Sequence, residues 1–189
     1  MRYDKWNVVS VTRDQSYQGG IKMAVIPVSF DLLRRYYPSR PNLTPELKRF
    51  MNSIPGTPCC VQISHSLNMA GQRITQTYSG QRRENSRIRV NGVDYYYLLA
   101  VDELERWLTL VYGAGENVRQ RTPDDTKTYL QDRTGILAFR NSGAGFHTEL
   151  WNGQQIVQRD MNENLCFNQP RVLFWDCGVP QWLQDYTSQ

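Results

Sequence analysis

The order of helix and strand signals constrains the fold of this chain more than any other feature of its sequence. Residues 30–37 carry apolar side chains at helical spacing, Thr44 followed by Pro45 marks a second helix start, and residues 95–112 contain a longer helix. After residue 135 the pattern changes to short apolar runs bounded by glycine and polar residues. These runs occupy residues 136–139, 146–151 and 171–175, and an Asn-Gly turn allows residues 154–158 to return as a further strand. Helices that precede an antiparallel sheet predict the α+β class, with the N-terminal helices packed on the sheet.

Another helix has the strongest start signal, because Thr57 offers a capping hydroxyl and Pro58 suits the first helical position. The helix runs to Gly71, and Cys59 in its first turn falls on the apolar face. The first turn of a helix has unpaired backbone N–H groups and the positive end of the helix dipole, and both favour a thiolate. Cys59 is therefore a candidate nucleophile. The alternative is a small buried side chain at the start of a core helix.

The chain has two histidines, His65 and His147. His65 lies six residues after Cys59 on the same helix, which places it about 120° around and roughly 9 Å along the axis. We therefore expect His65 to be a surface residue that does not reach the sulfur. His147 begins a strand after a glycine-rich loop, where its side chain can face the start of the helix. A helix-start cysteine followed by a strand histidine suits a Cys–His enzyme, although an isolated histidine can also be purely structural.

A third polar group should orient the second ring nitrogen of His147. Asp160 is the best candidate, because it follows the return strand of the expected hairpin. Glu149 shares a strand face with His147, two residues away, and would serve if the hairpin is shorter. Asn162 and Asn164 are weaker alternatives.

The remaining composition favours a single folded domain, residues 1–189. No linker or low-complexity tract divides the 189 residues. Mean hydropathy is −0.60, and no apolar run approaches the roughly 20 residues of a membrane span. The net charge of +4 comes from scattered basic residues and not from a stripe, which argues against nucleic-acid binding. The first residues lack the apolar stretch of a cleaved signal peptide, so we expect export by another route.

The four cysteines are Cys59, Cys60, Cys166 and Cys177. A chain of this length can build a core and does not need a disulfide framework. It has no Cys-x-x-Cys pair and only two histidines, so no zinc site is expected. Cys166 and Cys177 can be free or joined by a disulfide, and the sequence leaves both possibilities open.

Three blocks of the sequence resemble the fourth family of type VI secretion amidase effectors. Residues 58–71 resemble the helix that opens with the family's catalytic cysteine and runs on into a serine, a Leu-Asn and an Ala-Gly. Residues 136–139 and 146–153 resemble its catalytic-histidine strand, in which Leu-Trp and a turn glycine follow the histidine. Residues 172–175 resemble its closing strand, so the blocks span residues 58–175 in the family's order.

The resemblance implies a papain-like fold of the NlpC/P60 type. It also implies hydrolysis of the amide between D-glutamate and meso-diaminopimelate in peptidoglycan stem peptides. It assigns Cys59 as the nucleophile and His147 as the base, with no metal or organic cofactor. Asp160 matches the family's acid only approximately, because its spacing from the histidine is longer by a residue or two. Cys60 stands where the family usually has a small residue such as alanine.

The resemblance further implies an antibacterial toxin with three kinds of partner. These are the peptidoglycan stem peptide as substrate, a secretion machinery that delivers the protein to the periplasm of a target bacterium, and a cognate immunity protein. Two other hypotheses stay open. One is a different cysteine acyl-transfer enzyme, such as a deamidase or a protein endopeptidase, and the other is a non-catalytic binding module on the same fold. The sequence does not predict the oligomeric state.

Overall fold

A computed structural model describes residues 24–38, 43–53, 57–75, 86–90, 92–158 and 162–178. The helices of this part of the chain are α1 (Phe30–Tyr36), α2 (Pro45–Ser53), α3 (Pro58–Met69), α4 (Val101–Tyr112), α5 (Pro123–Tyr129) and α6 (Glu163–Phe167). The strands are β1 (Val25–Ile26), β2 (Arg87–Val90), β3 (Val93–Tyr96), β4 (Glu116–Asn117), β5 (Gly135–Arg140), β6 (Gly145–Trp151) and β7 (Arg171–Cys177). No helix of the described residues is long and apolar enough to cross a membrane.

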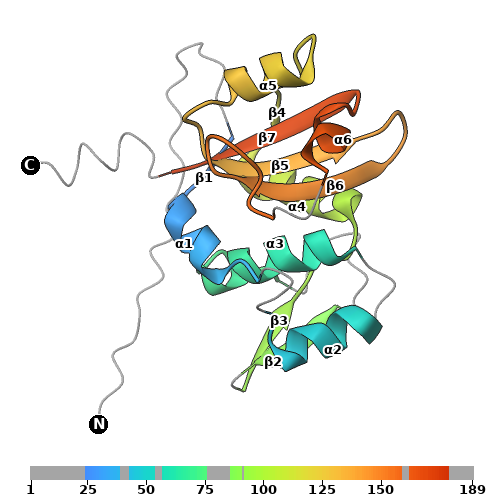
Figure 1. Cartoon of the computed structure of the whole chain (residues 1–189). Coiled ribbons are helices and arrows are strands. Elements are labelled where there is room, and N and C mark those ends of the chain that lie inside the picture. The colour runs from blue at the N-terminus through green and yellow to red at the C-terminus, as the bar shows by residue number, and fades with distance from the viewer. Residues whose placement is uncertain are drawn as a thin grey trace, which may run out of the picture.

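The main sheet has the strand order β1-β7-β5-β6, and β4 also pairs with β7. Strand β5 is antiparallel to both β6 and β7, and β4 is antiparallel to β7, whereas the short β1 runs parallel to β7. The α+β class is confirmed, and the sheet is antiparallel as predicted apart from the pairing of β1. Strands β2 and β3 form a separate hairpin beside α2, at the bottom of Figure 1.

Hydrophobic side chains cover both faces of the main sheet. One cluster joins α1, α3 and α4 to the sheet, and it includes Leu67, Leu104 and Leu150. The other cluster joins the opposite face to α6, and it includes Phe139 and Phe167. Strand β5 is therefore buried along nearly its whole length and reads as a continuous apolar run, as strands covered on both faces do. Figure 1 shows α5 on the other side of the sheet from α1 and α3.

A smaller cluster packs α2 and the β2–β3 hairpin onto the outer side of α3. As a result nine residues of α3 are buried. The sequence predicted one buried apolar face on this helix, and the structure buries more of its circumference than that. His65 shows the consequence most clearly. Its ring is half-buried, stacks on Tyr97, and its Nδ1 lies 3.0 Å from the Tyr97 hydroxyl. The prediction of a surface histidine was wrong because elements distant in sequence cover that side of the helix.

Two local predictions also change. Thr57 is the residue before α3, as expected, but its hydroxyl caps no helical N–H and points to the Leu99 carbonyl oxygen, 3.2 Å away. The expected strand 154–158 is reduced to one isolated bridge between Trp151 and Ile156. The Asn152 side chain explains this, because its Oδ1 accepts hydrogen bonds from the amides of Gln154 and Gln155 and holds the chain in a tight turn.

Candidate active site

The start of α3 places Cys59 against strand β6. Cys59 is the second residue of the helix, after Pro58, and its side chain is 6% exposed. The His147 side chain and the Thr148 backbone both hydrogen-bond its sulfur. The helix start and the strand that the sequence singled out therefore meet at these two side chains.

A β-bulge in β6 positions His147. Phe139 pairs with His147, but the next residue of β5, Arg140, pairs with Gly145, so Phe146 is left as an extra residue. Bulges bend a strand locally and can re-aim the neighbouring side chain. The His147 ring lies nearly parallel to its register partner Phe139, at an interplanar angle of 11° with centroids 6.3 Å apart.

Helix α4 holds the bulged end of β6 in place. The Gly145 amide donates to Asp102 Oδ1 at 3.1 Å, and the Arg140 guanidinium lies 2.7 Å from the same carboxylate. Arg140 also pairs with Glu105 one turn further along α4. The helix approaches so closely that a Cβ on Gly145 would lie 2.3 Å from the Cβ of Val101, so only glycine fits here without movement.

The Cys59 sulfur and the His147 ring shift each other's pKa in opposite directions. A hydrogen bond from Cys60 is the largest cause acting on Cys59, burial opposes it, and the contact with His147 adds to it. Together these hold the pKa of Cys59 well below its usual value. Burial disfavours the charged form of His147, but the contact with Cys59 and the nearby charges of Cys59 and Glu149 outweigh it and raise the pKa of His147 to about 9. Both shifts favour a thiolate on Cys59 paired with an imidazolium on His147.

Glu149 lies on the other side of the His147 ring. Its side chain is fully buried, and its Oε2 is 3.7 Å from His147 Nε2. Because Nε2 points at Glu149, the ring nitrogen left to meet the Cys59 sulfur is Nδ1. The site thus brings a cysteine and a carboxylate to the same histidine, which is an arrangement for acyl transfer.

The comparisons with known proteins assign the chain to a family. Residues 57–175 match the model of a protein family described as "Type VI secretion system (T6SS), amidase effector protein 4". The chain belongs to this family. As a member it is a peptidoglycan amidase, its activity is the hydrolysis of the amide between D-glutamate and meso-diaminopimelate, and as a secretion effector it acts on target cells. No sequence among curated proteins matches the chain.

Solved structures of amidase effector 4, or Tae4, have the same fold. Tae4 from Enterobacter cloacae superimposes with a TM-score of 0.58 at 18% identity, covering 82% of this chain and 100% of that one. The Enterobacter cloacae complex of Tae4 with Tai4 gives 0.58 at 18% identity, covering 81% and 100%. Salmonella typhimurium Tae4, bound to the immunity protein Tai4 from Enterobacter cloacae, gives 0.56 at 17% identity, covering 80% and 99%. The expected papain-like fold of the NlpC/P60 type is thereby confirmed.

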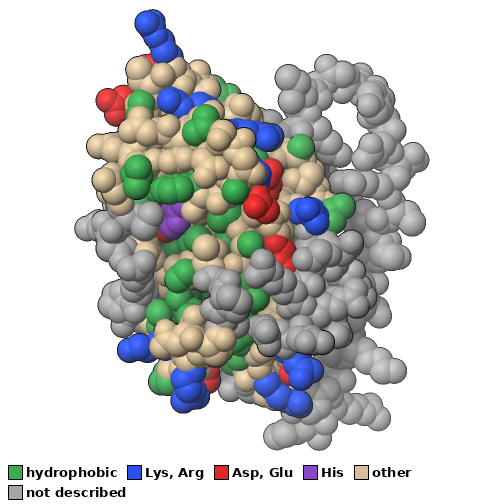
Figure 2. All heavy atoms as spheres, turned by 90° about the vertical axis from the view of Figure 1, so that its right-hand side faces the viewer, with side chains coloured by type: hydrophobic (Ala, Val, Ile, Leu, Met, Phe, Trp, Pro, Cys, Tyr) green, Lys and Arg blue, Asp and Glu red, His purple; other side chains and the backbone are tan. Residues whose placement is uncertain are grey.

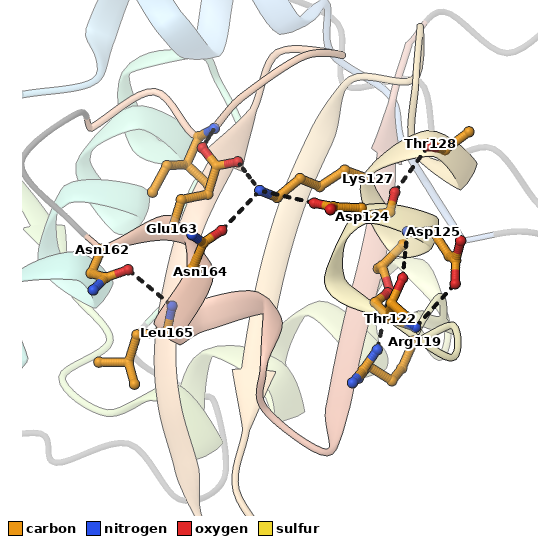
Figure 3. Close-up of polar contacts among 12 residues, drawn as sticks. Arg119, Thr122, Asp124, Asp125, Lys127, Thr128, Asn162, Glu163, Asn164 and Leu165 are labelled. Carbon is orange, nitrogen blue, oxygen red and sulfur yellow. Dashed lines mark hydrogen bonds and ion pairs between the residues drawn. The ribbon is translucent and has the colours of Figure 1, made fainter.

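The sequence offered several candidates for the polar side chain that orients His147 in this Tae4-family chain, and the structure places them differently. Asp160 lies outside the described residues, so its predicted role stays a prediction. Asn162 caps α6 by accepting from the Leu165 amide, and Asn164 accepts from Lys127 on α5, as Figure 3 shows. Asn162 is thus engaged in capping α6 and Asn164 in joining α6 to α5, and Glu149 is the carboxylate that the described residues place beside His147.

The sequence did not point to the amide pair beside this site. Gln62, one turn after Cys59 and 1% exposed, donates from Nε2 to Gln158 Oε1 at 2.7 Å and to the Pro38 carbonyl at 2.8 Å. This pair fastens the segment after β6 to α3. A glutamine on a helix that is otherwise apolar at that turn was the available signal, since a buried amide needs polar partners from elsewhere in the fold.

The other cysteines are free thiols. Cys166 and Cys177 form no disulfide, which decides the question that the sequence left open. Burial raises the pKa of Cys166 to about 12 and raises that of Cys177 further, so both are unreactive at neutral pH. Among the described residues no cluster of histidine, cysteine and carboxylate side chains could hold a metal ion.

Figure 2 shows one face of the molecule with its side chains coloured by type. Histidine atoms reach that surface among hydrophobic side chains and backbone, whereas lysine and arginine lie mainly toward its upper and lower ends.

Proposed function

We propose that Cys59 and His147 are the catalytic pair with which this effector hydrolyses its amide bond. The observation that supports the proposal is the contact between two buried side chains whose pKa values are displaced toward a thiolate and an imidazolium. A cysteine in that state is nucleophilic at neutral pH, and the histidine already carries the proton that the leaving amine requires.

The reaction follows from this arrangement. The Cys59 thiolate attacks the scissile carbonyl carbon, and backbone N–H groups in the first turn of α3 stabilise the resulting oxyanion. His147 passes its proton to the amine of diaminopimelate as the C–N bond breaks, which leaves a thioester on Cys59. Neutral His147 then removes a proton from a water molecule that attacks the thioester, and Cys59 leaves as a thiolate beside a protonated His147.

We also propose that residues 1–189 act as one amidase domain in the periplasm of a target bacterium, where an immunity protein of the producing cell would block it. Tae4 structures solved in complex with Tai4 support the expectation of such a partner. An inhibitor that covers Cys59 and His147 would protect the producer from its own toxin.

Digestion of purified peptidoglycan followed by mass spectrometry of the muropeptides tests the catalytic pair. We expect the wild-type protein to open the stem peptide between D-glutamate and diaminopimelate, and the Cys59→Ala and His147→Ala variants to be slower by about a thousandfold or more. Cys60→Ala is the matched control, because it removes the neighbouring sulfur and leaves the nucleophile. Cells that express the Cys60→Ala variant in the periplasm should lyse, and cells that express the Cys59→Ala variant should not. Equal activity of the two cysteine variants would exclude Cys59 as the nucleophile.

A further inference from the structure

A buried carboxylate with an unsatisfied oxygen lies next to the proposed base. Glu149 is fully buried, and its Oε1 accepts a hydrogen bond from the Leu150 amide at 2.8 Å. Its Oε2 has no hydrogen-bond partner, and neither has His147 Nε2, although the two atoms are only 3.7 Å apart. Two buried polar atoms that face each other are costly while unpaired, and a small shortening of their distance would pair them.

The buried carboxyl group of Glu149 requires a partner in the same place. Burying a carboxylate is unfavourable unless a cation and hydrogen bonds compensate it. Within the described part of the chain, the ion pair of Glu149 is with His147. The other titratable groups that face this pair are Cys59 on α3 and Cys166 on α6. Cys166 keeps its proton because burial raises its pKa to about 12, so His147 is the group whose charge responds to Glu149.

We propose that Glu149 is the positioning residue of His147. Its carboxylate holds the proton on Nε2, turns Nδ1 toward Cys59, and stabilises the imidazolium during the reaction. From His147 onward the register of β6 is regular, and at a spacing of two both residues project from the same face, so the backbone of β6 fixes their relation. This inference deepens the proposed function and rests on Cys59 and His147 being the catalytic pair.

The Glu149→Gln variant tests the positioning role, because it removes the charge and keeps the shape. We expect kcat to fall about ten- to a hundredfold with little change in KM, since Glu149 acts through His147 and not on the substrate. The alkaline limb of the pH–rate profile, set by His147, should move about one pH unit lower. Glu149→Asp keeps the charge and should restore the limb in part.

Glu116→Gln is the matched control. Glu116 is also a paired carboxylate, but its partner is Arg133 near the far end of the sheet. The same substitution there should leave kcat and the alkaline limb unchanged. Asp160→Asn supplies the competing outcome. If it abolishes turnover while Glu149→Gln keeps both kcat and the alkaline limb of the wild type, then Asp160 orients the ring and the inference is wrong.

The wild-type protein provides a test that needs no variant. With only two histidines in the chain, nitrogen NMR of ¹⁵N-histidine protein can follow each ring through a pH titration. We expect Nε2 of His147 to keep its proton after the ring becomes neutral, and the ring to titrate near pH 9. Loss of the Nε2 proton before the Nδ1 proton would overturn the inference even if every variant failed to fold. Full activity of Cys59→Ala would instead refute the proposed function itself.

Discussion

Removing the Cys60 thiol should make Cys59 less acidic without abolishing its reactivity. Cys60 is fully buried, and its hydrogen bond is the largest of the causes that lower the pKa of Cys59. Hydrogen bonds to charged groups contribute about 1.5–3 kcal/mol. Because a thiol is a weak donor, the hydrogen bond from Cys60 falls at the lower end of that range. Divided by about 1.36 kcal/mol per pKa unit, this gives a rise of about one unit in Cys60→Ala. The contacts with His147 and Thr148 remain, so the pKa of Cys59 stays below that of an ordinary thiol.

The pH dependence of alkylation by iodoacetamide measures this directly. The midpoint of the rate profile should lie about one pH unit higher in Cys60→Ala than in the wild type, while Cys60→Ser, which keeps a donor, should stay near the wild-type value. Cys59→Ala gives the background from Cys166 and Cys177, whose raised pKa values make them slow. An unchanged midpoint in Cys60→Ala would refute the reasoning, because it would mean that His147 and the helix start alone set the acidity of Cys59.

Three further predictions concern the support of the site. Gly145→Ala would force a Cβ to within 2.3 Å of Val101, so we expect a lower melting temperature and at least tenfold slower turnover, whereas Gly143→Ala has open space around it and should change neither. Trp151→Phe removes the hydrogen bond from the buried indole to the Leu130 carbonyl, 2.9 Å long, and should lower the free energy of unfolding in urea by about 1–2 kcal/mol. Hydrolysis should decline above about pH 9, because the raised pKa of His147 keeps the imidazolium through neutral pH and releases its proton only there; a decline beginning near pH 6.5 would show an unperturbed histidine.

Local signals made the main parts of the site predictable. The proline at the start of α3 and the glycine at its end define a helix whatever surrounds it, and so the position of Cys59 in the first turn could be read from the sequence. The alternation that places His147 and Glu149 on one face of β6 is equally local. Sequence reasoning therefore brought both the base and a nearby carboxylate into consideration, but it could not rank Glu149 against Asp160.

What depends on partners distant in sequence was missed. The bulge at Phe146 is defined by how β6 pairs with β5, and the residues of β6 alone do not predict it. The burial of His65 involves Tyr97, which directly follows the β2–β3 hairpin and lies 32 residues away in the sequence. Helix α5 is a different case, because the capping box of Thr122 and Asp125 is a local signal that was available and not used.

The position of the proposed catalytic pair between two hydrophobic clusters explains why so much of the fold affects its geometry. Cys59 belongs to the cluster that joins α1, α3 and α4 to the sheet. Phe139, on which the His147 ring stacks, belongs to the cluster on the opposite face. Strand β6, the last in the strand order, contributes side chains to both clusters, as β5 and β7 do. A core substitution in either cluster that moves β6 relative to α3 will therefore change the distance between sulfur and ring, and reduce turnover before it unfolds the protein.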